Sequence, residues 1–211
     1  MKAMFQQCRK PTGWLGTFMG LGMNVGHAPL WRWGLDHVAI QPDATILDVG
    51  CGGGRNVHTL ARVADRGNVY GVDYSRRMVR LARRVNRAFI RAGRVEIKYG
   101  SVSSLPFPDG TFDLVTSFES AIFWPSLVDD LREVWRVLKP GGTLLIANEA
   151  YKDERFEERN ARWVELAGIR HLLSPEETRG FLVESGYADV EIDVVPDRNW
   201  IAAVAKRPWG A

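Results

Sequence analysis

Short apolar runs alternate with stretches of helical periodicity along most of this 211-residue chain. Runs such as ATILDV (44–49) and NVYGVD (68–73) have the length and composition of buried strands, whereas the apolar residues after Ser75 recur at helical spacing. Strands that alternate with helices form a parallel sheet covered on both faces. The pattern therefore predicts an α/β fold, with strands at 44–49, 68–73, 95–99, 112–117 and 143–148 and helices at 55–66, from 75 to about 89 and at about 127–138.

The last part of the chain carries a different pattern. Ser174 and Glu177 form a capping box with a proline between them, and Gly186 ends the helix that they begin. Two strand-like runs follow, at 188–195 and 200–206. Because only four residues join them, too few for a parallel crossover, we expect these two strands to pair antiparallel.

Composition places the chain among ordinary globular proteins. Hydrophobic residues make up 45% and charged residues 25%. There is no apolar run long enough to span a bilayer, and the first residues lack the apolar core of a signal peptide, so a cytoplasmic protein without a membrane span is expected. The two cysteines, Cys8 and Cys51, have neither metal-ligand spacing nor the pattern of a disulfide framework. No metal site is therefore expected.

A glycine-rich turn directly follows the first predicted strand. In DVGCGGG, glycines at 50, 52 and 54 alternate with other residues before a helix begins. Glycines allow a tight turn and let a ligand lie against the main chain, and the helix adds free N–H donors. Arg55 stands where the third glycine of the dinucleotide fingerprint belongs, which disfavours NAD. Asp48, two residues before Gly50, is suited to a ligand with a positively charged amino group.

A second acid, Asp73, ends the second predicted strand, where a carboxylate can accept hydrogen bonds from both hydroxyls of a ribose. Together with SLPFPDGTFDLV (104–115) and VLKPGGTLLIANE (137–149), these motifs make the chain resemble the class I S-adenosylmethionine-dependent methyltransferases over about residues 40–206. The resemblance is closest to the ubiquinone, menaquinone and sterol methyltransferases. It implies a Rossmann-like, doubly wound seven-stranded sheet, mostly parallel, with an antiparallel C-terminal hairpin and an N-terminal helical cover.

The resemblance also implies roles for individual residues toward S-adenosylmethionine, whose product is S-adenosylhomocysteine. Asp48 would reach the amino group, Gly50 and Gly52 would line the methionine part, and Asp73 would hold the ribose. Ser101 departs from the family pattern, because it stands where an acid usually binds the adenine amino group. The remaining expected contacts are Tyr74 and Met78 beside the adenosine, the backbone of Val102 beside the base, and Ser117 with Phe118 near the sulfonium.

Methyl transfer from a sulfonium is an in-line displacement, so alignment of acceptor and methyl group supplies much of the rate and no side chain need react. If the acceptor must lose a proton, a base is required within hydrogen-bond reach. His27, in the expected cover, and Glu119, directly after the fourth strand, are the preferred catalytic candidates. Each also has a purely structural interpretation, as a packed histidine or an exposed loop carboxylate. Weaker candidates are Glu149, Tyr151 and His171.

Aromatic residues gather in the segments expected to border the pocket. The chain has eight tryptophans, and aromatic walls suit an aromatic, partly apolar acceptor. Core packing is the alternative for each of them. The expected substrate pocket comprises Trp31, Phe123 and Trp124, with Glu149 and Tyr151, and Trp14 and Trp33 lie in the same segments.

A single domain of four parts follows from these motifs. Residues 151–172 break the regular alternation and form a charged helix whose Phe156, Trp163 and Leu166 are suited to cover the site as a lid. The four parts are an N-terminal helical cover (1–40), a cofactor-binding core (41–149), a lid-like insertion (150–172) and a C-terminal helix with a strand hairpin (173–211).

The main prediction is a methyltransferase acting on a small-molecule acceptor. An RNA or protein methyltransferase is the alternative, because the helix after Ser75 presents many arginines, although a net charge of +3 makes nucleic acid the less favoured partner. A non-catalytic module that binds S-adenosylmethionine is the third interpretation. A two-fold homodimer is expected from base rates alone. The arginines are Arg76, Arg77, Arg80, Arg83, Arg84, Arg87 and Arg91.

Overall fold

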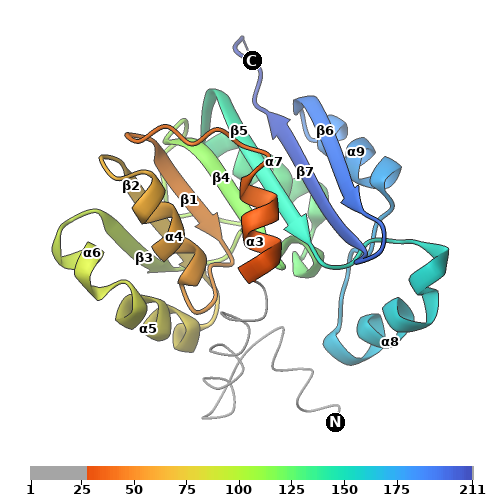
Figure 1. Ribbon diagram of the computed structural model, residues 1–211. Helices are drawn as coiled ribbons and strands as arrows, with labels where there is room; N and C mark the ends of the chain where they lie inside the picture. The colour runs from red at the N-terminus through yellow and green to blue at the C-terminus, as the bar shows by residue number, and fades with distance from the viewer. Residues whose placement is uncertain (1–27, 211) are drawn as a thin grey trace.

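The chain is described by a computed structural model from residue 28 to residue 210. Within this range the strands form one seven-stranded sheet in the order β3-β2-β1-β4-β5-β7-β6 (Figure 1). The first five strands are parallel, and β7 is antiparallel to both of its neighbours. The strands are β1 (Thr45–Val49), β2 (Asn68–Asp73), β3 (Val95–Tyr99), β4 (Phe112–Phe118), β5 (Leu138–Asn148), β6 (Ala188–Val195) and β7 (Trp200–Lys206).

Helices cover both faces of the sheet, as the alternating pattern predicts. Leu30, Leu60 and Val79 bury apolar side chains of α3, α4 and α5 against one face. Leu131 of α7 and Leu182 of α9 do the same on the other face (Figure 1). The helices are α3 (Ala28–Leu35), α4 (Arg55–Val63), α5 (Arg76–Val85), α6 (Arg87–Arg91), α7 (Leu127–Val137), α8 (Glu157–Ala167) and α9 (Pro175–Glu184), with short 3-10 helices η1 (Ala121–Phe123) and η2 (Glu154–Phe156).

The strand order determines where a ligand fits. Strand β1 lies between β2 and β4, so the strand order reverses direction at β1. The helices that connect the strands on the two sides of β1 therefore lie on opposite faces of the sheet. In open α/β sheets this switch point leaves a crevice beyond the carboxyl ends of the strands. The glycine-rich turn after β1 and Asp73 at the end of β2 both lie at that edge.

The predicted helix from 75 to about 89 is wrong in one respect, because it is two helices. Ser75 caps α5 by accepting a hydrogen bond from the backbone of Met78, as predicted. At Asn86 the helix ends and α6 begins. The Asn86 side chain is fully buried and donates to the backbone oxygens of Gly54, 2.8 Å away, and Ala82. The interruption therefore ties α5 to the glycine-rich turn.

The fifth strand also begins earlier than predicted, at Leu138 and not at residue 143. Helix α7 ends at Val137, and Leu138 pairs at once with Phe112 of β4. Gly141 donates its backbone N–H to Arg207 at 2.8 Å, and Arg207 donates back to Gly142 at 2.9 Å. These two bonds to Arg207, directly after β7, thus hold Gly141 and Gly142 in the strand direction.

The antiparallel C-terminal hairpin is confirmed, with β7 inserted between β5 and β6. Ser174 and Glu177 form the expected capping box at the start of α9. Of the predicted cover, the structure describes α3, whose Gly34 packs closely on Phe118 and Ala147. Among residues 28–210, no helix is long and apolar enough to cross a membrane.

Candidate functional site

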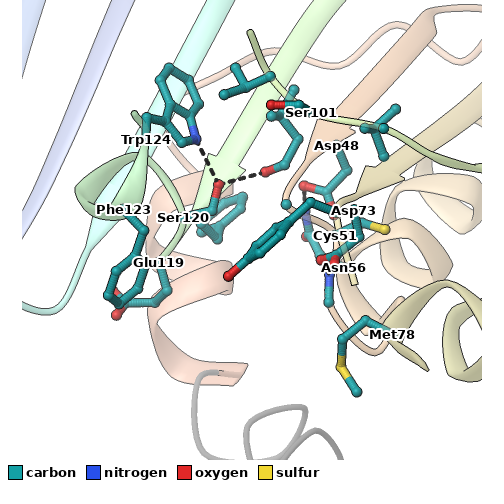
Figure 2. Close-up of a pocket in the computed structure, with 18 of the residues that line it drawn as sticks. Asp48, Cys51, Asn56, Asp73, Met78, Ser101, Glu119, Ser120, Phe123 and Trp124 are labelled. Atoms are coloured by element: carbon teal, nitrogen blue, oxygen red, sulfur yellow. Dashed lines mark hydrogen bonds between the residues drawn. The ribbon is translucent and has the colours of Figure 1, made fainter. Parts of the chain in front are cut away.

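A cavity of about 350 Å³ opens at the carboxyl ends of β1, β2 and β4. One side is built by the glycine-rich turn and the two acids at the carboxyl ends of β1 and β2, and the other by aromatic residues around η1 (Figure 2). The lining residues are Trp31, Asp48, Val49, Gly50, Cys51, Gly52, Gly53, Asn56, Val72, Asp73, Tyr74, Met78, Gly100, Ser101, Val102, Phe118, Glu119, Ser120, Phe123, Trp124, Pro125 and Arg170.

Asp48 is a buried acid in the wall of the cavity. Its Oδ1 accepts hydrogen bonds from Thr116 Oγ1 at 2.7 Å and from Asn56 Nδ2 at 2.9 Å. Both bonds that it accepts from the described part of the chain fall on this one oxygen. Burial raises the pKa of Asp48 from its usual 3.8 to about 7. The two hydrogen bonds act to lower the pKa, but the effect of burial is larger. A cationic ligand group beside Asp48 would favour its charged form.

Asp73, at the end of β2, holds the glycine-rich turn in place. Its Oδ2 accepts the backbone N–H of Gly52 at 2.9 Å, and its Oδ1 accepts that of Ser75 at 2.7 Å. Burial raises its pKa to about 6 although both hydrogen bonds act to lower it. The turn before α4 and the cap of α5 are thus both fixed on one carboxylate.

The glycines of the turn fit a ligand that lies against the main chain. Gly50, Gly52 and Gly54 all have positive φ. A Cβ on Gly50 would lie 2.3 Å from Ser120 Oγ, and one on Gly54 would meet Ala82 at 2.7 Å. A Cβ on Gly52, in contrast, would have no neighbour closer than 4.0 Å. Since Gly52 lines the cavity, this open space belongs to the site.

Ser120 organises the opposite side of the cavity. Its hydroxyl donates to the backbone oxygen of Val49 at 2.9 Å and accepts from Trp124 Nε1 at 3.2 Å (Figure 2). It also lies 3.0 Å from Ser117 Oγ. Trp124 is 4% exposed, and its indole N–H is held by the bond to Ser120. The aromatic wall therefore has a fixed position relative to β1.

Glu119 lines the cavity, but its carboxylate is already engaged. It accepts a hydrogen bond from the backbone N–H of Glu149, and its own N–H donates to Ala147 at 3.0 Å. Its φ of 54° lies in the left-handed region, which is uncommon for a residue with a side chain and tends to occur at functional sites. Glu119 thus has a structural role between β4 and β5.

Most predicted cofactor residues line one cavity, and two of the five predicted pocket residues do not. The cavity includes Trp31, Phe123 and Trp124, but Glu149 and Tyr151 are not among its lining residues. Tyr151 is buried and donates its hydroxyl to Asp153 at 3.0 Å. The other predicted residues that line it are Asp48, Gly50, Gly52, Asp73, Tyr74, Met78, Ser101, Val102, Phe118 and Glu119.

Of three other predicted residues, two do not line the cavity and one lies outside the described residues. Ser117 is fully buried beneath Ser120 and is not part of the cavity surface. His171 Nε2 lies 2.8 Å from the backbone oxygen of Trp124, which gives it a packing role. His27, like Trp14, lies outside the described residues, so its catalytic role stays a prediction.

The lid-like segment forms η2 and α8, as a charged helix was expected there. Arg159 stacks between Phe156 and Trp163, with its guanidinium carbon 4.5 and 4.6 Å from the two ring centres. Phe156, Trp163 and Leu166 do not line the cavity, and from 151–172 only Arg170 does. The covering role of this helix stays a prediction.

The sequence interpretation missed Asn56, Ser120 and Arg170. Asn56 occupies the first turn of α4, and only the fold brings its amide to Asp48. Ser120 follows Glu119 in a segment without a recognisable motif, and its role depends on contacts with residues 49 and 124. Arg170 lies in the segment that was interpreted only as a lid.

The arginines after Ser75 partly serve the fold. Arg83 donates to the backbone oxygen of Ile97 at 2.7 and 3.1 Å, and Arg76 lies 4.4 Å above the ring of Tyr99. Both contacts join α5 to β3. These two arginines therefore have structural roles, and nucleic-acid binding by this helix face stays an untested alternative.

Replacing Asp48 by asparagine is expected to stabilise the ligand-free protein at pH 8. The folded pKa lies above the unfolded value, so the contribution of Asp48 to stability is fully present below about pH 3.8 and is lost as the pH rises through about 7. A rise of this size corresponds to about 4 kcal/mol, and burial of the new amide offsets part of it. Asparagine retains an oxygen for Asn56 and Thr116.

The measurement is the melting temperature of both proteins at pH 5 and pH 8. At pH 8 we expect a net stabilisation of about 2 kcal/mol, which in a chain of this size raises the melting temperature of the variant roughly 4–8 °C above that of the parent. At pH 5 the difference in melting temperature should be clearly smaller. An equal or lower melting temperature at pH 8 would show that Asp48 is not a strained buried charge.

Comparison with known proteins agrees with the site. A family described as a methyltransferase domain matches residues 47–146. The chain is 34% identical over 164 residues to the 2-methyl-6-phytyl-1,4-hydroquinone methyltransferase of Synechocystis, a match that covers 77% of this chain and 49% of that protein. It is 36% identical over 129 residues to the demethylmenaquinone methyltransferase of Symbiobacterium thermophilum, which covers 59% of this chain and 51% of that one. The chain thus spans about half the length of these curated relatives.

A solved structure supports the fold. The S-adenosylmethionine-dependent methyltransferase of Aquifex aeolicus superposes with a TM-score of 0.72 at 20% identity, over 90% of this chain and 97% of that one. The matched family region extends from β1 into β5 and contains the glycine-rich turn, Asp73 and the aromatic wall. The motifs, the sheet order and these matches together support a methyltransferase of the class I S-adenosylmethionine-dependent type.

Proposed function

We propose that this chain binds S-adenosylmethionine in the described cavity and transfers the methyl group to a small-molecule acceptor. The observation that carries the proposal is the pair of buried carboxylates, Asp48 and Asp73, in the cavity wall. Neither makes an ion pair with a lysine or arginine of residues 28–210. A ligand that brings an ammonium group and two hydroxyls would complete both.

The other residues of the cavity fit the same ligand. Gly52 leaves open space beside the main chain, where the methionine part would lie. Met78 and Val102 are buried apolar residues in the cavity wall, and Ser101 adds a hydroxyl, so these three would hold the adenosine. Tyr74 is 38% exposed in the same wall and would cover it.

When bound, S-adenosylmethionine supplies a methyl group on a positively charged sulfur, and the methyl carbon is open to attack in line with the carbon–sulfur bond. The protein's part is then alignment of the acceptor and exclusion of water. The indole of Trp124 and the ring of Phe123, with Trp31 from α3, would position an acceptor with apolar surface against the glycine-rich turn. Glu119 would act as a base only if the acceptor carried a proton near the Glu119 carboxylate.

The named relatives favour a small acceptor. They are named as methyltransferases of 2-methyl-6-phytyl-1,4-hydroquinone and of demethylmenaquinone. The aromatic wall of this cavity suits such compounds. A two-fold homodimer and a cytoplasmic location remain predictions from the sequence.

Transfer of labelled methyl from S-adenosylmethionine into a cell extract tests the proposal. After the reaction the extract is separated into small-molecule, RNA and protein fractions. We expect label in the small-molecule fraction, and none above background with an Asp73→Ala variant. Label confined to RNA or protein would overturn the acceptor class, and tight cofactor binding without any label would indicate a sensor.

A further inference from the structure

The charges that line the cavity are unevenly distributed. Among its lining residues, all within 28–210, the acids are Asp48, Asp73 and Glu119, and the one cationic residue is Arg170. Asp48 and Asp73 come from the ends of β1 and β2, the side proposed for the cofactor. Arg170 comes from the segment between α8 and α9, which packs on η1.

The backbone around Arg170 is firmly attached to the aromatic wall. The N–H groups of Arg170 and His171 both donate to the backbone oxygen of Ile122, at 2.9 and 3.1 Å. The His171 ring adds a third bond, to the oxygen of Trp124. Ile169, just before, is buried. These three hydrogen bonds therefore place the backbone of Arg170 beside Phe123 and Trp124.

The guanidinium of Arg170 is exposed, and it makes no hydrogen bond, ion pair or ring contact with the side chains of residues 28–210. The arginines of the same segment behave differently. Arg155 pairs with Asp153, and Arg159 stacks on two rings and donates to Asn199. A guanidinium has five donors in a planar fork that matches a carboxylate or a phosphate. Arg170 thus offers a cation at the acceptor side of the cavity.

We propose that Arg170 determines acceptor specificity by binding an acidic group, a carboxylate or a phosphate, on an acceptor whose apolar or aromatic part lies against Phe123 and Trp124. The inference rests on the proposed function and names the substrate class of that same site. It divides the cavity into a half with Asp48 and Asp73 for the cofactor and an aromatic half with Arg170 for an anionic acceptor. Glu119 also lies in the aromatic half, beside Phe123, where its carboxylate accepts the backbone N–H of Glu149 (Figure 2).

One other anion has the same chemistry, the carboxylate of the cofactor itself. The two sources predict different effects of an Arg170→Gln substitution. If Arg170 binds the acceptor, the affinity for S-adenosylhomocysteine stays within about twofold of the parent and only acceptor binding falls. If it binds the cofactor carboxylate, the affinity for S-adenosylhomocysteine falls as well, and the proposal is overturned.

The test uses calorimetry on the full chain saturated with S-adenosylhomocysteine, with 2-naphthoate as an anionic probe and 2-naphthamide as its neutral match. We expect naphthoate to bind the parent more tightly than naphthamide. Arg170→Gln should weaken naphthoate at least about tenfold, the loss expected for a charge-assisted hydrogen bond, and leave naphthamide unchanged. Arg170→Lys should recover part of the loss. Arg87→Gln, at an exposed arginine away from the cavity, is the matched control and should change neither.

The natural acceptor gives a second measure that does not depend on the shape of the probe. The small-molecule pool of an extract is passed over an anion exchanger at pH 7, and both fractions are offered as acceptors. Methyl transfer confined to the retained fraction supports the proposal, and transfer to the unretained fraction overturns it. Absence of S-adenosylhomocysteine binding would instead refute the proposed function itself, so the two failures are distinguishable.

Discussion

Replacing Asp73 by alanine is expected to weaken binding of S-adenosylhomocysteine at least a hundredfold. The carboxylate would accept both ribose hydroxyls, and it also holds Gly52 and Ser75 through their N–H groups. Loss of two charge-assisted hydrogen bonds costs about 3–6 kcal/mol, which corresponds to a factor of roughly 10² to 10⁴ in affinity. Release of the turn adds to this cost. Calorimetric titration of the parent and the variant measures the effect.

Asp113→Ala provides a matched control for Asp73→Ala. Asp113, near the start of β4, also accepts one backbone N–H, that of Thr45 at 2.8 Å, and a bond from Lys139 at 2.7 Å. It lies at the opposite end of the strands and does not line the cavity. This variant should lose stability but keep its affinity for S-adenosylhomocysteine. Equal affinity losses in the two variants would mean that Asp73 acts through the fold alone.

Gly52→Ala is expected to reduce S-adenosylhomocysteine affinity by about tenfold or more while the protein stays folded. The nearest atom that the new methyl group would meet is the Gly50 oxygen at 4.0 Å. The methyl group would therefore occupy open space in the cavity that the ligand needs. The positive φ of 49° adds strain, because an alanine in the left-handed region costs roughly 1–2 kcal/mol. The measurement combines the melting temperature with the dissociation constant.

Gly93→Ala separates backbone strain from loss of ligand space. Gly93 has a φ of 74°, and a Cβ there would meet nothing within 4 Å. It lies in the turn before β3 and does not line the cavity. Both variants should therefore melt a few degrees below the parent, and only Gly52→Ala should bind the cofactor product weakly. Unchanged affinity in Gly52→Ala would remove the glycine-rich turn from the binding site.

Local sequence determines much of this fold, and for that reason the elements were predictable. The run 68–73 is a strand in the structure with the same bounds. Ser75 and Ser174 cap helices through bonds to residues three positions ahead, an interaction that depends on a few neighbours only. The acids at the ends of β1 and β2 were also predictable, because the carboxyl ends of parallel strands share one edge of the sheet.

Contacts between distant segments account for the errors. Asn86 interrupts the predicted helix because its amide finds the backbone of Gly54, which lies 32 positions away. Nothing in the local pattern announces such a partner, since the apolar periodicity continues to Phe89. Tertiary hydrogen bonding overrides helix periodicity here.

The same limit applies to the pocket. A position directly after a strand predicts that a residue lies near the site. It does not predict the direction in which the side chain points. Tyr151 was expected to line the pocket, yet its backbone bonds to Asn199 and Asn160 hold it in a buried contact outside the cavity. Ser120 and Arg170 are defined by contacts with η1 and β1 and have no local motif.

A structure of this chain in complex with S-adenosylhomocysteine would show directly where the cofactor product binds. We expect the ligand across the carboxyl ends of β1 and β2, with both ribose hydroxyls on Asp73, the amino group beside Asp48 and the sulfur facing Phe123 and Trp124. A cavity that stays empty at saturating ligand, or a ligand bound away from these two carboxylates, would contradict this expectation.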